Sequence, residues 1–144
     1  YAGVKEPKAA FAGMVTHMDK SLARIFKTLK KLKLDKNTLV IFSSDNGTHQ
    51  EGGHSFEALD SNGIYRGGKR DLYEGGIRVP LIIRWPGITK AHQTNDTPVQ
   101  SMDLTATILD AAKVKLADDV SLDGESLRPL FNGEQLKRKA LYWH

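Results

Sequence analysis

The sequence has 144 residues, with 21 Lys and Arg against 17 Asp and Glu for a net charge of +4, 40% hydrophobic residues and no cysteine. This length and balance fit one globular domain and exclude a wholly disordered, collagen-like or coiled-coil chain. The absence of cysteine excludes disulfides, thiolate zinc sites and cysteine nucleophiles, so any chemistry must rest on oxygen ligands, histidine and lysine. The longest apolar run, residues 38–42, is far shorter than the roughly 20 residues that cross a bilayer.

Residues 9–34 are predicted to form an amphipathic helix. Its apolar residues recur at steps of three and four, the spacing of one helical face: Phe11, Met14, Met18, Leu22, Ile25, Leu29 and Leu32. Four lysines between positions 27 and 33 crowd its C-terminal end, where cations complement the helix dipole. We interpret them as a solvated helix end, with a patch for an anionic ligand as the alternative.

Residues 38–43 form a short apolar run that is typical of a strand buried on both faces of a parallel sheet. The following stretch, residues 45–76, is rich in glycine pairs and Asn-Gly turns, and a loop of this length in a compact domain is usually functional or mobile. A second strand is predicted at residues 77–85, closed by Pro86-Gly87. The order of helix and strand favours an α/β architecture.

The last third of the chain is predicted to hold one helix, a turn and a strand. The helix covers residues 101–112, with Ser101 as N-cap and with Leu104, Ile108, Leu109 and Ala111 or Ala112 facing inward. A short turn follows at residues 126–131. Residues 139–143 are predicted to form a strand.

Candidate chemistry lies where the first strand ends and in the glycine-rich stretch. Asp45 and Asn46 follow the strand directly, and their oxygens suit a hard cation such as calcium or magnesium, although Asp-Asn-Gly is also a common turn sequence. Lys69 follows two glycines and precedes the second strand, so its ammonium is a candidate for binding an anionic group. His49 and His54 are candidate proton donors or substrate contacts, but loop histidines are often merely solvated.

The order of motifs resembles that of the sulfatase family, the arylsulfatase-like branch of the alkaline phosphatase superfamily. The motifs are Met18-Asp19, residues 39–47 ending in Asp45-Asn46-Gly47, Gly68-Lys69, residues 73–80, Trp85-Pro86-Gly87 and Asp103-Leu104. The resemblance implies an α/β fold that is part of the alkaline phosphatase-like three-layer α/β/α sandwich, with an incomplete, mostly parallel sheet. It also implies that residues 1–135 are the later part of the catalytic domain and that residues 136–144 begin the small C-terminal subdomain.

The resemblance implies roles for four residues. In sulfatases the Asp-Asn pair after this strand binds calcium (Ca2+), a role that falls on Asp45 and Asn46. The lysine ahead of the Tyr-Glu-Gly-Gly segment contacts the sulfate and the leaving oxygen, so Lys69 is the expected catalytic and substrate-binding residue. Residues 47–53 resemble a Gly-Pro-His-x-Glu-Gly-Gly variant, with Thr48 in place of the proline, and this places His49 at the substrate edge.

The nucleophile of the family is a formylglycine hydrate, made from a Cys or Ser two residues before a Pro and four before an Arg. Lys5, Arg78, Arg84, Asp96 and Leu127 stand two positions before the five prolines, so this motif is absent from the 144 residues. The family's aspartate pair for calcium and its upstream basic residues are absent too. We therefore expect an internal piece of a sulfatase that hydrolyses aryl or carbohydrate sulfate monoesters, inactive by itself, with the formylglycine lying upstream.

Two alternatives stay open. A phosphodiesterase or phosphonate hydrolase of the same superfamily uses the same sheet and a related metal site. A nonenzymatic module that binds polyanions is suggested by the net charge of +4 and the lysine cluster. The expected partners are a sulfated small molecule or glycan and the N-terminal part of the same protein, with no nucleic acid and no membrane span. The resemblance implies a periplasmic or secreted protein.

Overall fold

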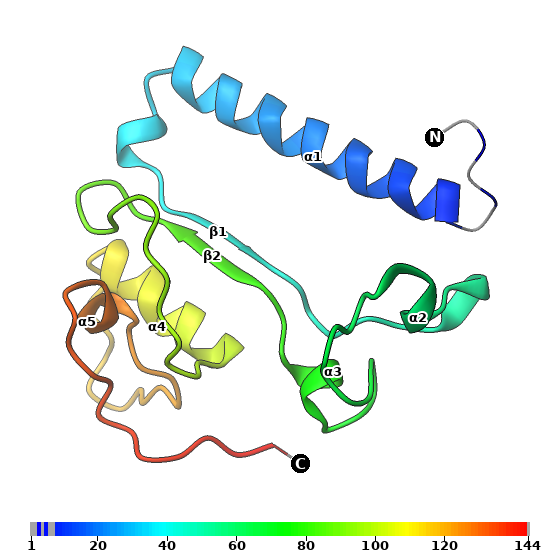
Figure 1. The fold of residues 1–144 in the computed structure, drawn as a ribbon. Coiled ribbons are helices and arrows are strands. Elements are labelled where there is room, and N and C mark those ends of the chain that lie inside the picture. The colour runs from blue at the N-terminus through cyan, green and yellow to red at the C-terminus, as the bar shows by residue number, and fades with distance from the viewer. Residues whose placement is uncertain (1–2, 4, 6–7, 144) are drawn as a thin grey trace. The chain divides into compact units, whose positions relative to one another are not determined.

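The computed structural model of the chain describes residue 3, residue 5 and residues 8–143 (Figure 1). The chain divides into two compact units. Unit 1 contains the residues up to Asp35 together with Ile41–Ile82, and unit 2 contains Lys36–Val40 together with the residues from Ile83 onward. The elements in chain order are α1 (Lys8–Lys31), η1 (Asp35–Asn37), β1 (Val40–Ser43), η2 (Glu51–Gly53), α2 (Phe56–Leu59), α3 (Glu74–Ile77), β2 (Leu81–Arg84), α4 (Ser101–Ala111) and α5 (Arg128–Phe131).

The α1 helix confirms the predicted amphipathic helix. It ends three residues before the predicted position because Lys33 adopts the left-handed conformation, with φ 58°. The Leu34 and Lys33 N–H groups donate to the carbonyls of Leu29 and Lys30, at 2.9 and 3.1 Å, in the pattern of a Schellman motif. None of the described helices is long and apolar enough to span a membrane.

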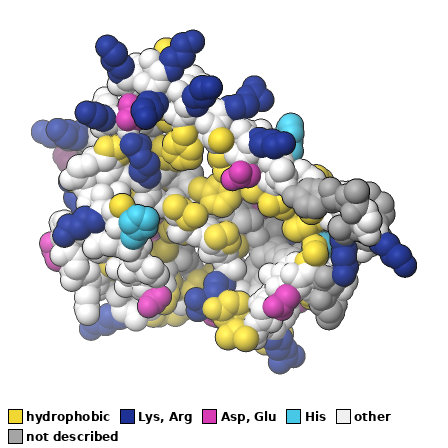
Figure 2. All heavy atoms as spheres, turned by 45° about the horizontal axis from the view of Figure 1, so that its top comes forward, with side chains coloured by type: hydrophobic (Ala, Val, Ile, Leu, Met, Phe, Trp, Pro, Cys, Tyr) yellow, Lys and Arg dark blue, Asp and Glu magenta, His cyan; other side chains and the backbone are white. Residues whose placement is uncertain are grey.

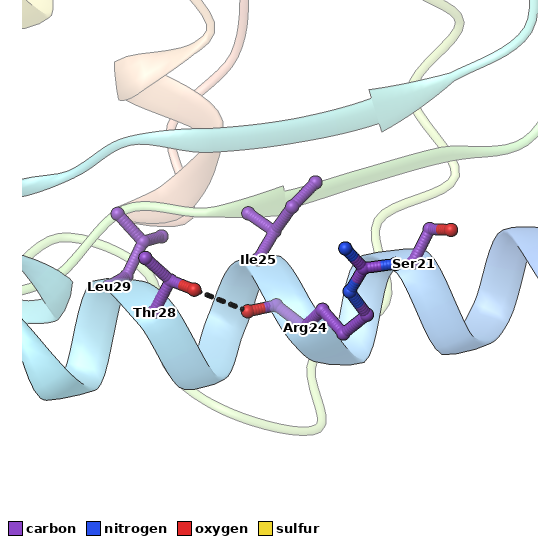
Figure 3. Close-up of a pocket in the computed structure, with 5 residues that line it drawn as sticks. All are labelled: Ser21, Arg24, Ile25, Thr28 and Leu29. Atoms are coloured by element: carbon purple, nitrogen blue, oxygen red, sulfur yellow. Dashed lines mark hydrogen bonds between the residues drawn. The ribbon is translucent and has the colours of Figure 1, made fainter.

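The apolar face of α1 stays open among the described residues. Met14 and Ile25 are each more than half exposed, and no residue of the helix is fully buried. Figure 2 shows apolar side chains reaching the surface among lysine and arginine side chains. A hollow along α1 is lined by Ser21, Arg24, Ile25, Thr28 and Leu29, and the Thr28 hydroxyl donates to the Arg24 carbonyl at 2.8 Å (Figure 3).

Two strands, β1 and β2, pair in one sheet. The hydroxyl of Ser43, at the end of β1, donates to the carbonyl of Pro80, just before β2, at 2.9 Å, and Figure 1 shows the arrows running in opposite directions. The pair is therefore antiparallel and does not itself supply the parallel pairing of the expected sheet. As a consequence, the segment that leaves β1 and the segment that enters β2 lie at the same sheet edge.

The predicted start of the second strand, at residue 77, is wrong. Residues 74–77 form the helical turn α3, in which Gly76 and Ile77 donate to the Tyr73 carbonyl and Arg78 donates to the Glu74 carbonyl. Strand β2 begins only at Leu81. The predicted strand at residues 139–143 is also wrong, because no strand is present there among the described residues.

The core of unit 2 surrounds Trp85, Ala106, Leu127 and Leu130, all of which are buried. The ring of Trp85 packs edge-on against the ring of Phe131, with 6.3 Å between centroids. Helix α4 confirms the predicted helix, although its N-cap is Gln100 rather than Ser101, because the Gln100 N–H donates to the Asp103 carboxylate at 2.8 Å.

The predicted inward face of α4 is partly wrong. Its buried residues are Asp103, Ala106 and Thr107, whereas the Ile108 side chain is half exposed; of the two alanines offered as alternatives, Ala111 is half-buried and Ala112 is exposed. Leu104 and Leu109 are half-buried, as the prediction requires. The polar residues face inward because the Thr107 hydroxyl donates to the Asp103 carbonyl at 2.6 Å and accepts the Leu127 N–H at 2.9 Å.

Candidate functional site

Three backbone hydrogen bonds, all within unit 1, organise the segments after β1 and before β2, and the first two of them join one segment to the other. The Gly47 N–H donates to the Gly76 carbonyl at 2.9 Å, and the Lys69 N–H donates to the Thr48 carbonyl at 2.7 Å. The Gly75 N–H donates to the Arg66 carbonyl at 2.8 Å. We call this arrangement of residues 46–48, 66–69 and 75–76 the loop junction. It places the Asp45-Asn46 pair and Lys69 on segments that are bonded to each other.

The loop junction depends on glycine at four positions. A Cβ atom added to Gly47 would collide with the Gly75 carbonyl, and one added to Gly76 would collide with the carbonyls of Asp71 and Gly68. A Cβ atom on Gly75 would meet the carbonyls of Gly67 and Arg66, and one on Gly68 would meet the Phe56 ring and the Thr48 carbonyl. Glycine is the residue that permits such close backbone approach. Gly47, Gly68, Gly75 and Gly76 therefore indicate tight backbone packing in this part of the loop.

Lys69 and Arg70 occupy the tip of a tight turn between Gly68 and Asp71. The Asp71 N–H donates to the Gly68 carbonyl at 2.9 Å, and the Gly68 N–H donates to the Asp71 carboxylate, also at 2.9 Å. Arg70 has φ 81°, which is the conformation of the third residue of a type II turn and normally favours glycine. The turn presents two adjacent basic side chains from a backbone that is held at both ends.

The ammonium of Lys69 lies beside the carboxylate of Glu51. The Lys69 Nζ is 3.6 Å from Glu51 Oε2, and the Arg70 guanidinium is 2.7 Å from Glu51 Oε1. Attraction to Arg70, and then to Lys69, lowers the pKa of Glu51, so the carboxylate is ionised at neutral pH. The Lys69 side chain is one-third exposed, so an anion in solution can reach it.

Asp45 and Asn46 lie directly after β1, where their oxygens are available. The Asp45 carboxylate is exposed, and among the described residues no hydrogen bond or ion pair engages it. The Asn46 side-chain N–H donates to the Gly47 carbonyl at 2.9 Å, which leaves the side-chain oxygen free to accept. Two neighbouring oxygen donors suit calcium, but calcium takes about 6–8 oxygen ligands. The described residues contain no group of three or more His, Asp or Glu side chains that could hold a metal, so they do not form a complete metal site.

His49 is held by its own loop. Its Nδ1 accepts the Glu51 N–H at 3.1 Å, so the neutral ring carries its proton on Nε2. Its ring lies 5.4 Å from the ring of His54, which lies 4.9 Å from the ring of Phe11. His54 is thus part of an aromatic cluster with α1, whereas His49 is tied to the residue that pairs with Lys69. Glu51 and Arg70 were not singled out from the sequence, because no short motif links two residues so far apart in a loop.

Comparison with known proteins gives a consistent result. The family profile described as Sulfatase matches residues 4–114. Human steryl-sulfatase is 40% identical over 136 residues, which cover 93% of this chain and 23% of that protein. The N-acetylgalactosamine-6-O-sulfatase of Bacteroides thetaiotaomicron is 34% identical over 133 residues, covering 88% of this chain and 26% of that protein. The chain thus spans about a quarter of the length of the curated relatives it matches.

Solved structures agree in fold. The structure of Ps i-CgsB in complex with k-i-k-neocarrahexaose superposes with a TM-score of 0.80 at 31% identity, covering 91% of this chain and 28% of that one. The structure of BT4656 in complex with its substrate D-glucosamine-2-N,6-O-disulfate gives a TM-score of 0.64 at 29% identity, covering 83% of this chain and 22% of that one. These likenesses confirm the expected partial α/β domain.

Proposed function

Because the chain belongs to the sulfatase family, we propose that it supplies the sulfate-binding lysine and two calcium ligands of an enzyme that hydrolyses sulfate monoesters. The observation that carries the proposal is the loop junction, since its backbone bonds tie the segment of Asp45 and Asn46 to the segment of Lys69. We further propose that residues 1–135 are the later part of the catalytic domain and that residues 136–144 begin the C-terminal subdomain.

Asp45 and Asn46 are the proposed calcium ligands of this chain. Their donor oxygens fit the cation, because the carboxylate is exposed and the Asn46 amide nitrogen, not its oxygen, is used within the loop. When bound, calcium and the formylglycine supplied outside these residues provide Lewis-acid charge stabilisation and the nucleophile. The remaining calcium ligands come from the same outside part of the protein.

Lys69 is the proposed catalytic residue of this chain. Hydrolysis of a sulfate monoester builds negative charge on the sulfate oxygens and on the departing oxygen, and a fixed ammonium stabilises both. The turn between Gly68 and Asp71 fixes the backbone of Lys69, and the side chain is accessible to the substrate. His49, with Nε2 directed away from its bond to Glu51, is proposed to contact the edge of the substrate. Aryl or carbohydrate sulfate esters are the proposed substrates.

The test uses the intact protein and 4-nitrophenyl sulfate. Asp45→Ala is expected to abolish calcium binding measured by titration calorimetry and to abolish release of 4-nitrophenol. Asp119→Ala is the matched control, because Asp119 is an exposed carboxylate in a loop of unit 2. Lys69→Ala is expected to lower kcat by about 10²–10³-fold, the usual cost of removing one group that stabilises developing charge.

Three outcomes would contradict the proposal. Wild-type calcium affinity in Asp45→Ala would remove the metal role of the pair. Hydrolysis of 4-nitrophenyl phosphate diesters in preference to the sulfate would point to phosphoester chemistry. Salt-sensitive retention on heparin that survives Asp45→Ala, in a protein without esterase activity, would instead favour polyanion binding through the lysines of α1.

A further inference from the structure

Glu51 joins two basic residues at the tip of the loop that carries Lys69. One carboxylate oxygen is 2.7 Å from the Arg70 guanidinium, and the other is 3.6 Å from the Lys69 ammonium. The contact to Arg70 has the length of a charge-assisted hydrogen bond, whereas the contact to Lys69 is longer. Glu51 is thus held firmly by Arg70 and loosely by Lys69.

The backbone around both partners is fixed. The Glu51 N–H donates to His49 Nδ1, and the Thr48 carbonyl accepts the Lys69 N–H. Arg70 adopts a left-handed conformation, which costs a non-glycine residue backbone strain. A glycine would fit this turn without strain, so a side chain at position 70 is a candidate for a specific task.

We propose that Glu51 and Arg70 are positioning residues for Lys69, with Arg70 holding the Glu51 carboxylate so that it orients the Lys69 ammonium without competing with the sulfate of the substrate. The inference rests on the proposed function, because it assumes that Lys69 binds sulfate. The three side chains carry a net charge of +1, two cations against one carboxylate. If the Arg70 side chain is removed, the Glu51 carboxylate pairs with the Lys69 ammonium instead. The sulfate must then compete with this carboxylate for Lys69 and is repelled by its negative charge.

The charge arrangement predicts an asymmetric response. Arg70→Gln is expected to weaken sulfate binding, because the Glu51 carboxylate is then free to pair with Lys69. Glu51→Gln is expected not to weaken sulfate binding, because it removes the competing charge. In the double variant there is no carboxylate at position 51 to compete for Lys69, so the loss caused by Arg70→Gln is expected to disappear. The effect of Arg70 is therefore conditional on Glu51.

The experiment measures the affinity of the intact protein for inorganic sulfate by titration calorimetry. Arg70→Gln is expected to raise the Kd about two- to fivefold, the range expected from a solvent-exposed ion pair. Glu51→Gln and the double variant are expected to bind sulfate at least as tightly as the wild type. The same pattern is expected in the KM for 4-nitrophenyl sulfate, while Glu51→Gln lowers kcat because Lys69 is less well oriented.

Two further variants control for folding and for charge in general. Arg70→Gly removes the side chain and relieves the left-handed backbone, so weaker sulfate binding in a protein of unchanged or higher stability cannot be a folding defect. Glu74→Gln alters another carboxylate–arginine pair of unit 1, that of Glu74 with Arg78, and is expected to leave the sulfate Kd unchanged.

The proposal is overturned if Arg70→Gln weakens sulfate binding equally with and without Glu51, because Arg70 then contacts the anion itself. It is also overturned if neither variant changes sulfate binding or the KM. A wild-type protein that neither binds sulfate nor hydrolyses the ester overturns the proposed function together with this inference. A wild-type protein that does both, with variants that fail the pattern, overturns the inference alone.

Discussion

Two carboxylates, one in each unit, face arginine in opposite settings. Asp103 in unit 2 is fully buried, and it accepts hydrogen bonds from Arg138 and from the N–H groups of Gln100 and Glu125. Glu51 in unit 1 is half exposed and is shared between two cations. A buried charge whose acceptor positions are filled holds segments together, whereas a half-exposed charge with a loose partner leaves that partner available to a ligand.

The two carboxylates also differ in why their pKa values are low. Burial acts to raise the pKa of Asp103, but the hydrogen bonds from Arg138, Gln100 and Glu125 outweigh it, and the pKa falls below the ordinary 3.8. Around Glu51 the pKa is lowered mainly by the attraction of Arg70 and Lys69. The Asp103 network also reaches Glu125, whose carboxylate accepts the N–H groups of Lys137 and Arg138 at 2.8 and 2.7 Å. It therefore ties the C-terminal segment to α4.

The largest expected effect follows from removing the buried carboxylate. Asp103→Ala leaves the mostly buried Arg138 without its partner and leaves two backbone N–H groups unpaired. We expect the free energy of unfolding to fall by about 3–5 kcal/mol, the usual cost of breaking a buried ion pair. Urea unfolding measures the change, with Asp119→Ala as the exposed control. A loss below about 1 kcal/mol would show that the Asp103 network is not what holds the C-terminal segment.

Lowering the pH should remove the stabilisation that the ionised Asp103 carboxylate provides, without any substitution. Because the pKa of Asp103 is lower in the folded protein than the ordinary 3.8, its ionised form stabilises the fold above that pH. This contribution is lost as the pH falls through the folded-state pKa. The difference in unfolding free energy between the wild type and Asp103→Asn is therefore expected to be constant above about pH 5 and to shrink below about pH 4. A difference that persists unchanged in acid would contradict the ionic role of Asp103.

The next largest loss of stability is expected from substituting a glycine of the loop junction. Gly47→Ala places a methyl group against the Gly75 carbonyl, and backbone atoms cannot move aside as a flexible side chain does. We expect a loss of about 1–3 kcal/mol in unfolding free energy, typical of overpacking, together with loss of sulfatase activity.

Gly13→Ala is the matched control, because nothing lies within 4 Å of a Cβ there and the helix interior favours alanine. It is expected to stabilise the protein by about 0.5–1 kcal/mol. Equal effects of the two substitutions would contradict the packing argument.

Local patterns predicted the elements better than their contacts. The three- and four-residue steps predicted α1 because helical periodicity is a property of one segment. The start of β2 was misplaced because Ile77 and Val79 are residues that favour strands, whereas hydrogen bonds to the Tyr73 and Glu74 carbonyls make residues 74–77 a helical turn. Ile108 was placed inward because apolarity was taken as burial, whereas Thr107 and Asp103 are buried by bonds to residues far along the chain.

The residues of the candidate site also fall into two groups, those that short motifs predicted and those whose pairing depends on the fold. Asp45, Asn46, His49 and Lys69 were found because they stand in short motifs, and their roles stay predictions. Glu51 and Arg70 were not singled out because their pairing depends on the loop junction, which brings together segments that are well separated in the sequence. The glycine pairs were the signal that was present in the sequence. They were taken as turns, although four of the glycines lie where a Cβ atom would meet backbone.

The smallest expected effect on stability comes from the carboxylate of unit 1. Glu51→Gln breaks two solvent-exposed ion pairs, and such pairs contribute little to stability, so the free energy of unfolding should change far less than it does in Asp103→Ala. Urea unfolding of Glu51→Gln beside Asp103→Ala measures this difference directly. If the two carboxylates destabilised the protein equally when replaced, Glu51 would be a structural residue like Asp103. A small change in stability together with an altered affinity for sulfate would instead show that Asp103 stabilises the fold whereas Glu51 acts on ligand binding.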